Sequence, residues 1–266
     1  MRTKALDQTF TDTQKITGFL GDTIRTHVAT NFKVSVVTYT KKVTEDWHHH
    51  DYSHLSWILN GGNLETRRSN EIQVKPGTIL LYDVGEIHRN RFTAHPSKNL
   101  NIEFGPDFFN DEISLTHYSN KAENTTDLLK IYMELSYADS YSADAIEHMV
   151  KSLFWNSEKT LSKDWVEKAK EIINDQWSEF LSLDYLSKEL HMHPVTISKH
   201  FSKRTGFTLA EYMRKVKICR AIDMLISTQK PYAEIAAQCG FSDQSHMTRL
   251  IREFTGTTPG KIRAFI

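Results

Sequence analysis

Four histidines and one tyrosine combine residue types and a spacing that could coordinate a ligand or a metal ion. They are His48, His50, Tyr52, His54 and His88. If Trp47–Leu59 forms one strand, its period of two places the first four side chains on one face. The apolar Leu55, Trp57 and Leu59 then occupy the other face. With the first face turned inward to meet His88 from a neighbouring strand, three or four imidazoles could hold zinc, iron or nickel.

A second set of side chains could hydrogen-bond to DNA, and it occurs on two copies of one unit. Leu183–Gly206 and Ile235–Gly256 repeat the same pattern at an offset of about 49 to 50 residues. In each copy the second helix has apolar residues at a spacing of three to four and a polar opposite face. The polar faces carry Thr196, Ser198, Lys199 and Lys203 in the first copy and Gln244, Ser245, Thr248, Arg249 and Arg252 in the second. These residue types pair with base edges and phosphates in a major groove.

Local signals define the helices that must position these polar faces. Ser182 is expected to cap a helix over Leu183–Leu190, and Pro194 suits the first turn of the helix that follows. In the second copy Gly240 ends one helix and Ser242–Asp243 opens the next. Each copy is therefore predicted to be a helix–turn–helix unit.

One amphipathic helix is predicted to join the two copies. Its apolar positions are Leu209, Tyr212, Val216, Cys219, Ile222 and Ile226. At about 1.5 Å per residue, a helix of about twenty residues spans about 30 Å. Successive major-groove faces on one side of B-DNA lie about 34 Å apart, so the two recognition helices could occupy adjacent grooves.

The remainder of the chain divides into a strand-rich part and a helical part. Short β-branched and aromatic runs predict strands at 34–39, 55–59, 71–74, 78–82 and 100–104. Turn signals lie at 60–63, 75–77 and 95–97. Helical spacing of apolar residues follows at 127–136 and 144–155, and the polar stretch 156–163 is the expected boundary. The predicted fold class is α+β, with a small β-barrel or sandwich, then helices, then an all-α domain.

Composition and charge are those of a globular protein with two unlike halves. The chain is 39% hydrophobic and formally neutral, yet Lys+Arg number 17 against 21 Asp+Glu over residues 1–162 and 16 against 12 over residues 163–266. A mildly acidic half joined to a mildly basic half is typical of a sensor fused to a DNA reader. Cys219 and Cys239 fall at apolar helical positions and are expected to be reduced core thiols. Without an apolar run near residue 1 or a membrane-length segment, a cytoplasmic protein is expected.

The C-terminal part, from about residue 165, resembles the DNA-binding domain of the AraC/XylS family of bacterial transcription regulators. The matching residues are Phe201, Gly206, Tyr212, Ala221, Leu225, Ile235, Ala236, Gly240, Phe241, Ser242, Asp243, Ser245, Arg249, Gly256, Thr258, Pro259 and Arg263. The resemblance implies that bases and phosphates are contacted by Val195, Thr196, Ser198, Lys199, Gln244, Ser245, His246, Thr248 and Arg249. Lys203 is added to these candidate contacts only because it lies on the polar face of its helix. His193 and Ser187 replace a Ser and an Ala of the family pattern, so the first unit is expected to be capped differently.

The N-terminal half resembles the cupin barrel with which many of these regulators sense a ligand. His48 and His50 fit the opening of the first cupin motif, with His54 where a glutamate would stand, and Gly85–His88 fits the second. Three interpretations of the histidines stay open at this point: a divalent metal site, an effector pocket without metal, or packing alone. The expected domains are a cupin-like barrel over 1–119, a helical connector and dimerisation candidate over 120–162, and the DNA-binding domain over 163–266.

The expected function is sequence-specific transcription regulation by a DNA-binding protein, not an enzyme, controlled by a small-molecule effector. The expected partners are double-stranded DNA and the effector, with RNA polymerase and a second copy of the chain as further candidates and no membrane. No cofactor is assigned beyond the candidate divalent metal. One alternative is a metal-dependent cupin enzyme fused to a DNA-binding module, although no general base or nucleophile accompanies the histidines. Another is an architectural DNA-binding protein without an effector.

Overall fold

The structure, a computed structural model, describes residues 13–41, 43, 45–67, 70–109, 122–139, 141–154, 165–178 and 181–265. The chain divides into two compact units, Met1–Asn110 with Tyr132–Glu147 and Asp111–Ile131 with His148–Ile266. Each unit is described by itself below. The boundaries expected near residue 119 and at 156–163 lie outside the described residues.

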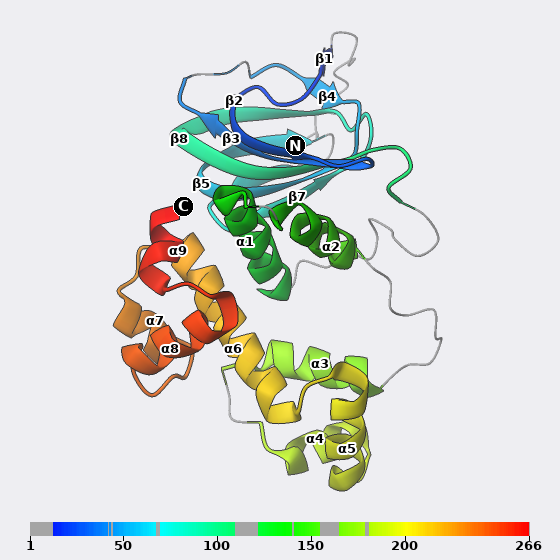
Figure 1. Ribbon diagram of the computed structural model, residues 1–266, viewed down its shortest axis with the longest axis vertical. Helices are drawn as coiled ribbons and strands as arrows, with labels where there is room; N and C mark the ends of the chain where they lie inside the picture. Colours follow the sequence, from blue (N-terminus) through cyan, green and yellow to red (C-terminus); the bar gives the residue numbers. More distant parts are fainter. Residues whose placement is uncertain are drawn as a thin grey trace, which may run out of the picture. The chain divides into compact units, whose positions relative to one another are not determined.

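Within its described residues, the first unit contains a curled sheet of eight strands (Figure 1). The strands are β1 (Gln14–Ile16), β2 (Asp22–Val28), β3 (Phe32–Tyr39), β4 (His48–His50), β5 (His54–Arg67), β6 (Glu71–Val74), β7 (Ile79–Tyr82) and β8 (His88–Phe104). Strands β1, β4, β8, β3 and β2 follow one another across the sheet, and β5 pairs with β6, β7 and β8. Strand β8 therefore pairs with β3, β4 and β5, so its register determines which residues of these three strands lie opposite one another.

Strands β5 and β8 are longer than the sequence predicts because both run through segments with turn-like composition. Strand β5 continues through Asn60–Asn63, where its pairing with β8 shifts register. Gly61 and Gly62 have φ angles of 77° and 123°, so these glycines serve β-bulges and not a turn. His95–Ser97 likewise lies inside β8. The turn predictions at 60–63 and 95–97 are wrong, whereas the turn at 75–77 is confirmed.

The condition that Trp47–Leu59 forms one strand is not met, although the strand predicted at 55–59 lies within β5. Strand β4 ends at His50, a bend occupies residues 51 and 52, and β5 begins at His54. The alternation of side chains therefore restarts at His54. From this residue both faces of β5 are buried as far as Leu59, which explains why a simple alternation of polar and apolar residues does not describe the strand.

Two helices follow the strands in sequence, as the periodicity predicts. They are α1 (Ala122–Tyr137) and α2 (Ser142–Phe154). Their apolar positions are buried at Leu128, Leu129, Ile131, Ile146, Val150 and Phe154. Burying one such side chain contributes about 1.5–3 kcal/mol, so these stripes are part of the folded core.

The described residues of the second unit after α2 form seven helices (Figure 1). They are α3 (Trp165–Asp175), α4 (Leu183–Leu190), α5 (Pro194–Thr205), α6 (Leu209–Ser227), α7 (Tyr232–Gln238), α8 (Gln244–Thr255) and α9 (Pro259–Phe265). Helix α6 joins the two repeats. It packs against α3 and against α5, the second helix of the first repeat, and it also packs against α7, α8 and α9, of which α7 and α8 form the second repeat. The predicted arrangement of two helix–turn–helix units joined by one long helix is confirmed.

The ends of these helices follow the capping signals of the sequence. The backbone N–H of Tyr185 donates to the Ser182 hydroxyl at 3.1 Å, and the N–H of His246 donates to the Asp243 carboxylate at 2.7 Å. The two departures from the family pattern also act at helix ends. His193 accepts the N–H of Val195 through its ring nitrogen at 3.3 Å, and Ser187 donates to the Met192 carbonyl at 2.6 Å.

The cores of both repeats contain the residues that the helical spacing indicates. Ile197 and Phe201 of α5 and Met247 and Ile251 of α8 are fully buried. Both cysteines of the chain, Cys219 and Cys239, are buried and form no disulfide, as expected. None of the described helices is both long enough and apolar enough to cross a bilayer.

Candidate functional site

The register of the sheet brings the predicted histidines to one cavity. His48 of β4 lies directly opposite His88 of β8, and their ring centroids are 4.4 Å apart. His50, two residues further along β4, lies on the same face, 4.7 Å from the ring of His54. His54 lies opposite Tyr82 of β7 and stacks on its ring at 4.2 Å. Five side chains from four strands therefore surround one point.

The face of β5 that lines this cavity carries His54, Ser56 and Ile58. The sequence alone does not show which face of β5 points into the cavity. In the structure burial does not distinguish the two faces either, because Leu55 and Trp57 on the other face are equally buried. Tyr52 does not join the histidines. It lies in the bend between β4 and β5, is 48% exposed, and does not line the cavity, so the expectation that it shares the histidine face is corrected.

Backbone carbonyls fix the orientation of the histidine rings. The Nδ1 atoms of His48, His54 and His88 lie 3.0, 3.3 and 2.9 Å from the carbonyl oxygens of the residues two positions earlier. A carbonyl oxygen only accepts, so Nδ1 must carry the proton and donate it. In the neutral ring, Nε2 is then left with a free lone pair.

Burial keeps these rings neutral. Loss of hydration, reinforced by the neighbouring histidines, lowers the pKa of His50 to about 4 and that of His88 to about 3. The same two causes lower the pKa of His54, and burial also lowers that of His48. At neutral pH the cluster is therefore a set of uncharged imidazoles.

A buried ionic network holds Tyr82 against the histidines. The Tyr82 hydroxyl donates to the Glu65 carboxylate, which is fully buried. Burial first, and the charge of Glu65 second, raise the pKa of Tyr82, so this hydroxyl stays protonated. Arg67 donates to Glu65 at 2.6 Å and to Glu86 at 2.8 Å. Because Glu86 also offers its carbonyl to His88, the network reaches the cluster from two sides.

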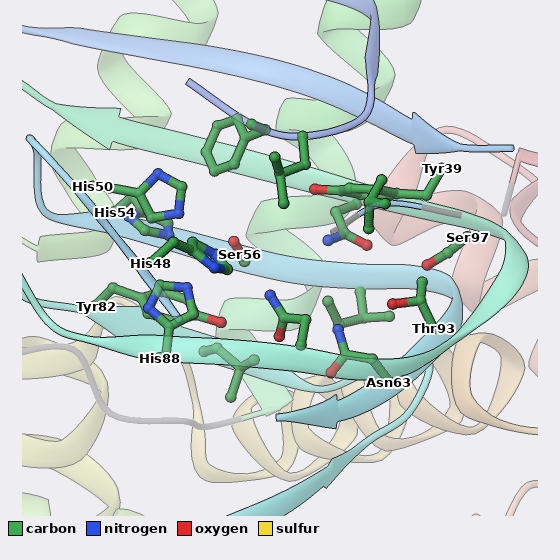
Figure 2. A pocket seen from close by; sticks show the side chains of 17 residues that line it. Tyr39, His48, His50, His54, Ser56, Asn63, Tyr82, His88, Thr93 and Ser97 are labelled. Carbon is green, nitrogen blue, oxygen red and sulfur yellow. The ribbon is translucent and has the colours of Figure 1, made fainter. Parts of the chain in front are cut away.

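The opposite end of the cavity is lined by amides and hydroxyls. Figure 2 shows the four histidines and Tyr82 at one end and Tyr39, Asn63, Thr93 and Ser97 at the other. Asn90 and Asn99 also line the cavity. The side-chain oxygens of Asn63, Asn90 and Asn99 are buried without a hydrogen-bond partner among the described residues. Leaving such an atom unpaired costs about 1–3 kcal/mol, so three of them in one cavity indicate groups that meet a ligand or water.

The cavity is small. Its volume of about 50 Å³ accommodates a few water molecules, since each needs about 10–15 Å³. Sites for drug-sized ligands measure about 300–1,000 Å³. In the described conformation the cavity suits an ion with a few small ligands, or a molecule of very few atoms.

Several lining residues escaped the sequence interpretation. Asn63 was not identified because residues 60–63 have the composition of a turn. Asn90 and Asn99 were not identified because they lie in parts of β8 without a clear strand pattern. Tyr82 ends a strand that the sequence does predict, and its position two residues after Leu80 is the signal that could have placed it in the cavity.

The second candidate site is the polar surface of the two recognition helices. On α5, Ser198, Lys199 and Lys203 are exposed, Thr196 is partly exposed, and the apolar Val195 is 64% exposed. An apolar side chain this exposed at the start of a helix has no role in the described core.

On α8 the corresponding side chains border an open hollow. Gln244, Ser245, Thr248, Arg249 and Arg252 line it together with Glu253 and Thr258, and its volume is about 700 Å³. His246 differs from its neighbours. Its Nδ1 lies 2.9 Å from the Ser242 hydroxyl, and its ring packs edge-on against Phe241 at 5.8 Å, so it supports the turn before α8.

Comparison with known proteins agrees with this division into a strand-rich part that contains the cavity and a helical part that carries the two polar surfaces. Residues 33–169 match the model of the AraC-like ligand binding domain, and residues 186–264 match that of a helix-turn-helix domain. The first match covers more than half of the chain. The chain therefore belongs to the AraC family of transcription regulators, with a ligand-binding domain followed by a helix-turn-helix DNA-binding domain.

Individual relatives match to different extents. AdaA of Bacillus subtilis, a bifunctional transcriptional activator and DNA repair enzyme, is 32% identical over 107 residues, which are 40% of this chain and 51% of AdaA. The chain thus spans about half the length of that relative. The transcriptional activator RhaR of Mannheimia succiniciproducens is 20% identical over 82% of this chain and 86% of its own. ToxT of Vibrio cholerae, a solved structure, is 13% identical over 89% of this chain and 99% of its own, with a TM-score of 0.40. Most of the named relatives are transcription regulators.

Proposed function

We propose that this regulator reads its operator with the polar faces of α5 and α8 and takes its effector into the sheet cavity between the histidines and the amides. The observation that carries the proposal is the pairing of two solvent-facing polar helices with one polar cavity on a single chain. Effector binding would shift the population of conformers that engage the operator.

On the DNA side, the proposed contacts come from both repeats. They are Val195, Thr196, Ser198, Lys199 and Lys203 of α5, with Gln244, Ser245, Thr248 and Arg249 of α8. His246 supports this surface through Ser242 and Phe241. Arginine and lysine side chains pair with guanine edges or phosphates, and the shorter polar side chains reach bases or backbone. Solvent exposure supports this assignment, because seven of the nine side chains are exposed and those of Thr196 and Thr248 are partly exposed.

On the effector side, His48, His50, His54 and His88 are the proposed contacts, and the amides of the far end join them. Tyr52 is left out because it lies outside the cavity. The domain limits at 119 and 162 are part of the same proposal, as are cytoplasmic location, action without enzymatic turnover, and contact of the DNA-bound chain with RNA polymerase or with a second copy of itself.

The test of the DNA surface compares specific and random DNA. A genomic fragment bound by the chain is first identified by genome-wide mapping of bound DNA. Arg249→Ala is then expected to weaken binding to that fragment by about 1–3 kcal/mol if it contacts a base edge. Lys199→Ala tests the first repeat in the same way. The measurement is fluorescence anisotropy at fixed salt, because phosphate contacts make affinity strongly salt-dependent.

Lys75→Ala is the matched control. It removes one positive charge from an exposed turn of the sheet unit, far along the chain from both recognition helices. Equal losses on specific and random DNA would make Arg249 a phosphate contact. The proposal for this surface fails if neither Arg249→Ala nor Lys199→Ala changes affinity more than Lys75→Ala does.

A further inference from the structure

We propose that the histidine end of the cavity binds one divalent transition-metal ion through one ring nitrogen each of His48, His50 and His88. The inference rests on the proposed role of this cavity as the effector site and adds what the site holds. It assigns the ion three protein ligands and leaves a coordination position for an oxygen atom of the effector or of water.

Geometry is the first support. His48, His50 and His88 are buried and can each offer one ring nitrogen, and these three atoms lie within 4.8 Å of one another. A tetrahedral zinc site with metal–nitrogen bonds of about 2.0–2.1 Å has its nitrogens about 3.3 Å apart. Small rotations of the three rings would close the difference. Among the described residues no other group of three histidine, cysteine or acidic side chains converges in this way.

The hydrogen bonds to backbone carbonyls are the second support. Nδ1 of His48 and of His88 is already occupied as a donor, so the lone pair available to a ligand is that of Nε2. The ring of His50 is oriented by a hydrogen bond with the backbone of Gly18. Metal-bound histidines almost always have their other ring nitrogen bonded to a carbonyl or carboxylate, because this fixes the ring and raises its basicity.

The chemistry of the surroundings is the third support. The network behind Tyr82 contains two carboxylates, Glu65 and Glu86, and one guanidinium, Arg67, so it adds negative charge near the cluster. Imidazole ligands favour zinc, copper, nickel or iron over magnesium or calcium.

The size and polarity of the cavity define the class of effector that could bind beside the ion. A volume of about 50 Å³ excludes a large apolar molecule in this conformation. The unpaired amide oxygens belong to Asn63, Asn90 and Asn99, which line the cavity, and these oxygens need donors. A small molecule with an oxygen ligand at one end and hydroxyl or amino groups at the other fits both ends.

The test uses the full chain, purified without a polyhistidine tag, stripped with a chelator and dialysed. Zn²⁺ is titrated by calorimetry, and Co²⁺ by its visible absorption, which reports nitrogen ligation directly. About one equivalent per chain is expected. His50→Ala and His88→Ala should each weaken binding by at least about tenfold, since each removes one of three protein ligands.

His49→Ala is the matched control, since His49 lies on the same strand between two proposed ligands but does not line the cavity. It should bind zinc like the unchanged chain, and circular dichroism checks that each variant is folded. Less than about a tenth of an equivalent in the unchanged chain, or undiminished binding by a folded His50→Ala, overturns the inference. The unchanged chain alone decides the question if a variant does not fold.

Operator binding by the same preparations separates this inference from the proposed function. Operator binding without metal binding would refute the metal site and leave the proposed regulatory function intact. Metal binding without any preference for a DNA sequence would refute the proposed DNA contacts and leave the metal site intact.

Discussion

At the scale of single residues, hydrogen-bond partners decide what otherwise similar side chains can do. His50 and His246 are both histidines that the sequence marks as candidate contacts. The ring of His50 lines a cavity, whereas that of His246 contacts a serine hydroxyl and an aromatic ring of its own turn. Residue type and spacing identified His50, and the family resemblance identified His246, but only the structure shows which one is available to a ligand.

Asp223 gives a residue-scale prediction about pH. It lies partly buried on α6, and burial raises the pKa of its carboxyl to about 6, opposed by Thr125 and Arg220. Because the unfolded chain ionises this group near its ordinary value of about 3.9, folding loses stability as pH rises from about 4 to 6. Asp223→Asn should therefore raise the free energy of unfolding by about 1–3 kcal/mol at pH 7.5 and by little at pH 4.

Urea unfolding at both pH values measures this difference. Asp175→Asn, at the exposed end of α3, controls for the general effect of removing a carboxylate from the same unit. A stabilisation that is the same at pH 4 and pH 7.5 would show that burial does not control the ionisation of Asp223.

At the scale of elements, the helices could be predicted much more fully than the strands. Caps, prolines and apolar spacing predicted both ends of α4 and the starts of α5 and α8, because these signals are local in sequence. Strands β5 and β8 could not be predicted over their full length, since pairing between distant segments carries both through glycine and proline residues. The same pairing placed His48 opposite His88, and no short-range pattern contains that information.

Gly62 gives the prediction for the bulged strand β5. Its φ angle is 123°, and a Cβ atom there would lie 2.2 Å from the carbonyl oxygen of Val74 in β6. Gly62→Ala should lower the free energy of unfolding of the sheet unit by more than about 2 kcal/mol, because the backbone must move.

Gly85→Ala separates the two causes. Gly85 also has a positive φ angle, 71°, but a Cβ atom there meets nothing within 4 Å, so it should cost only the conformational penalty of about 1–2 kcal/mol. Equal losses for both variants in urea unfolding would mean that the approach of Val74 does not constrain β5.

At the scale of the whole molecule, the account depends on two reading helices joined by one helix. Helix α6 has 19 residues, which corresponds to about 28 Å at about 1.5 Å per residue. The repeat of the major groove on one side of B-DNA is about 34 Å. The repeats belong to one chain, so a single copy could contact two successive grooves without a partner.

The most direct test of this claim is hydroxyl-radical footprinting of the full chain on the genomic fragment that it binds. Two protected stretches are predicted, with centres about 10.5 base pairs apart on one face of the duplex. Lys199→Ala should weaken protection mainly in one stretch, and Arg249→Ala mainly in the other. A single protected stretch, or two substitutions that weaken the same stretch, would contradict the account.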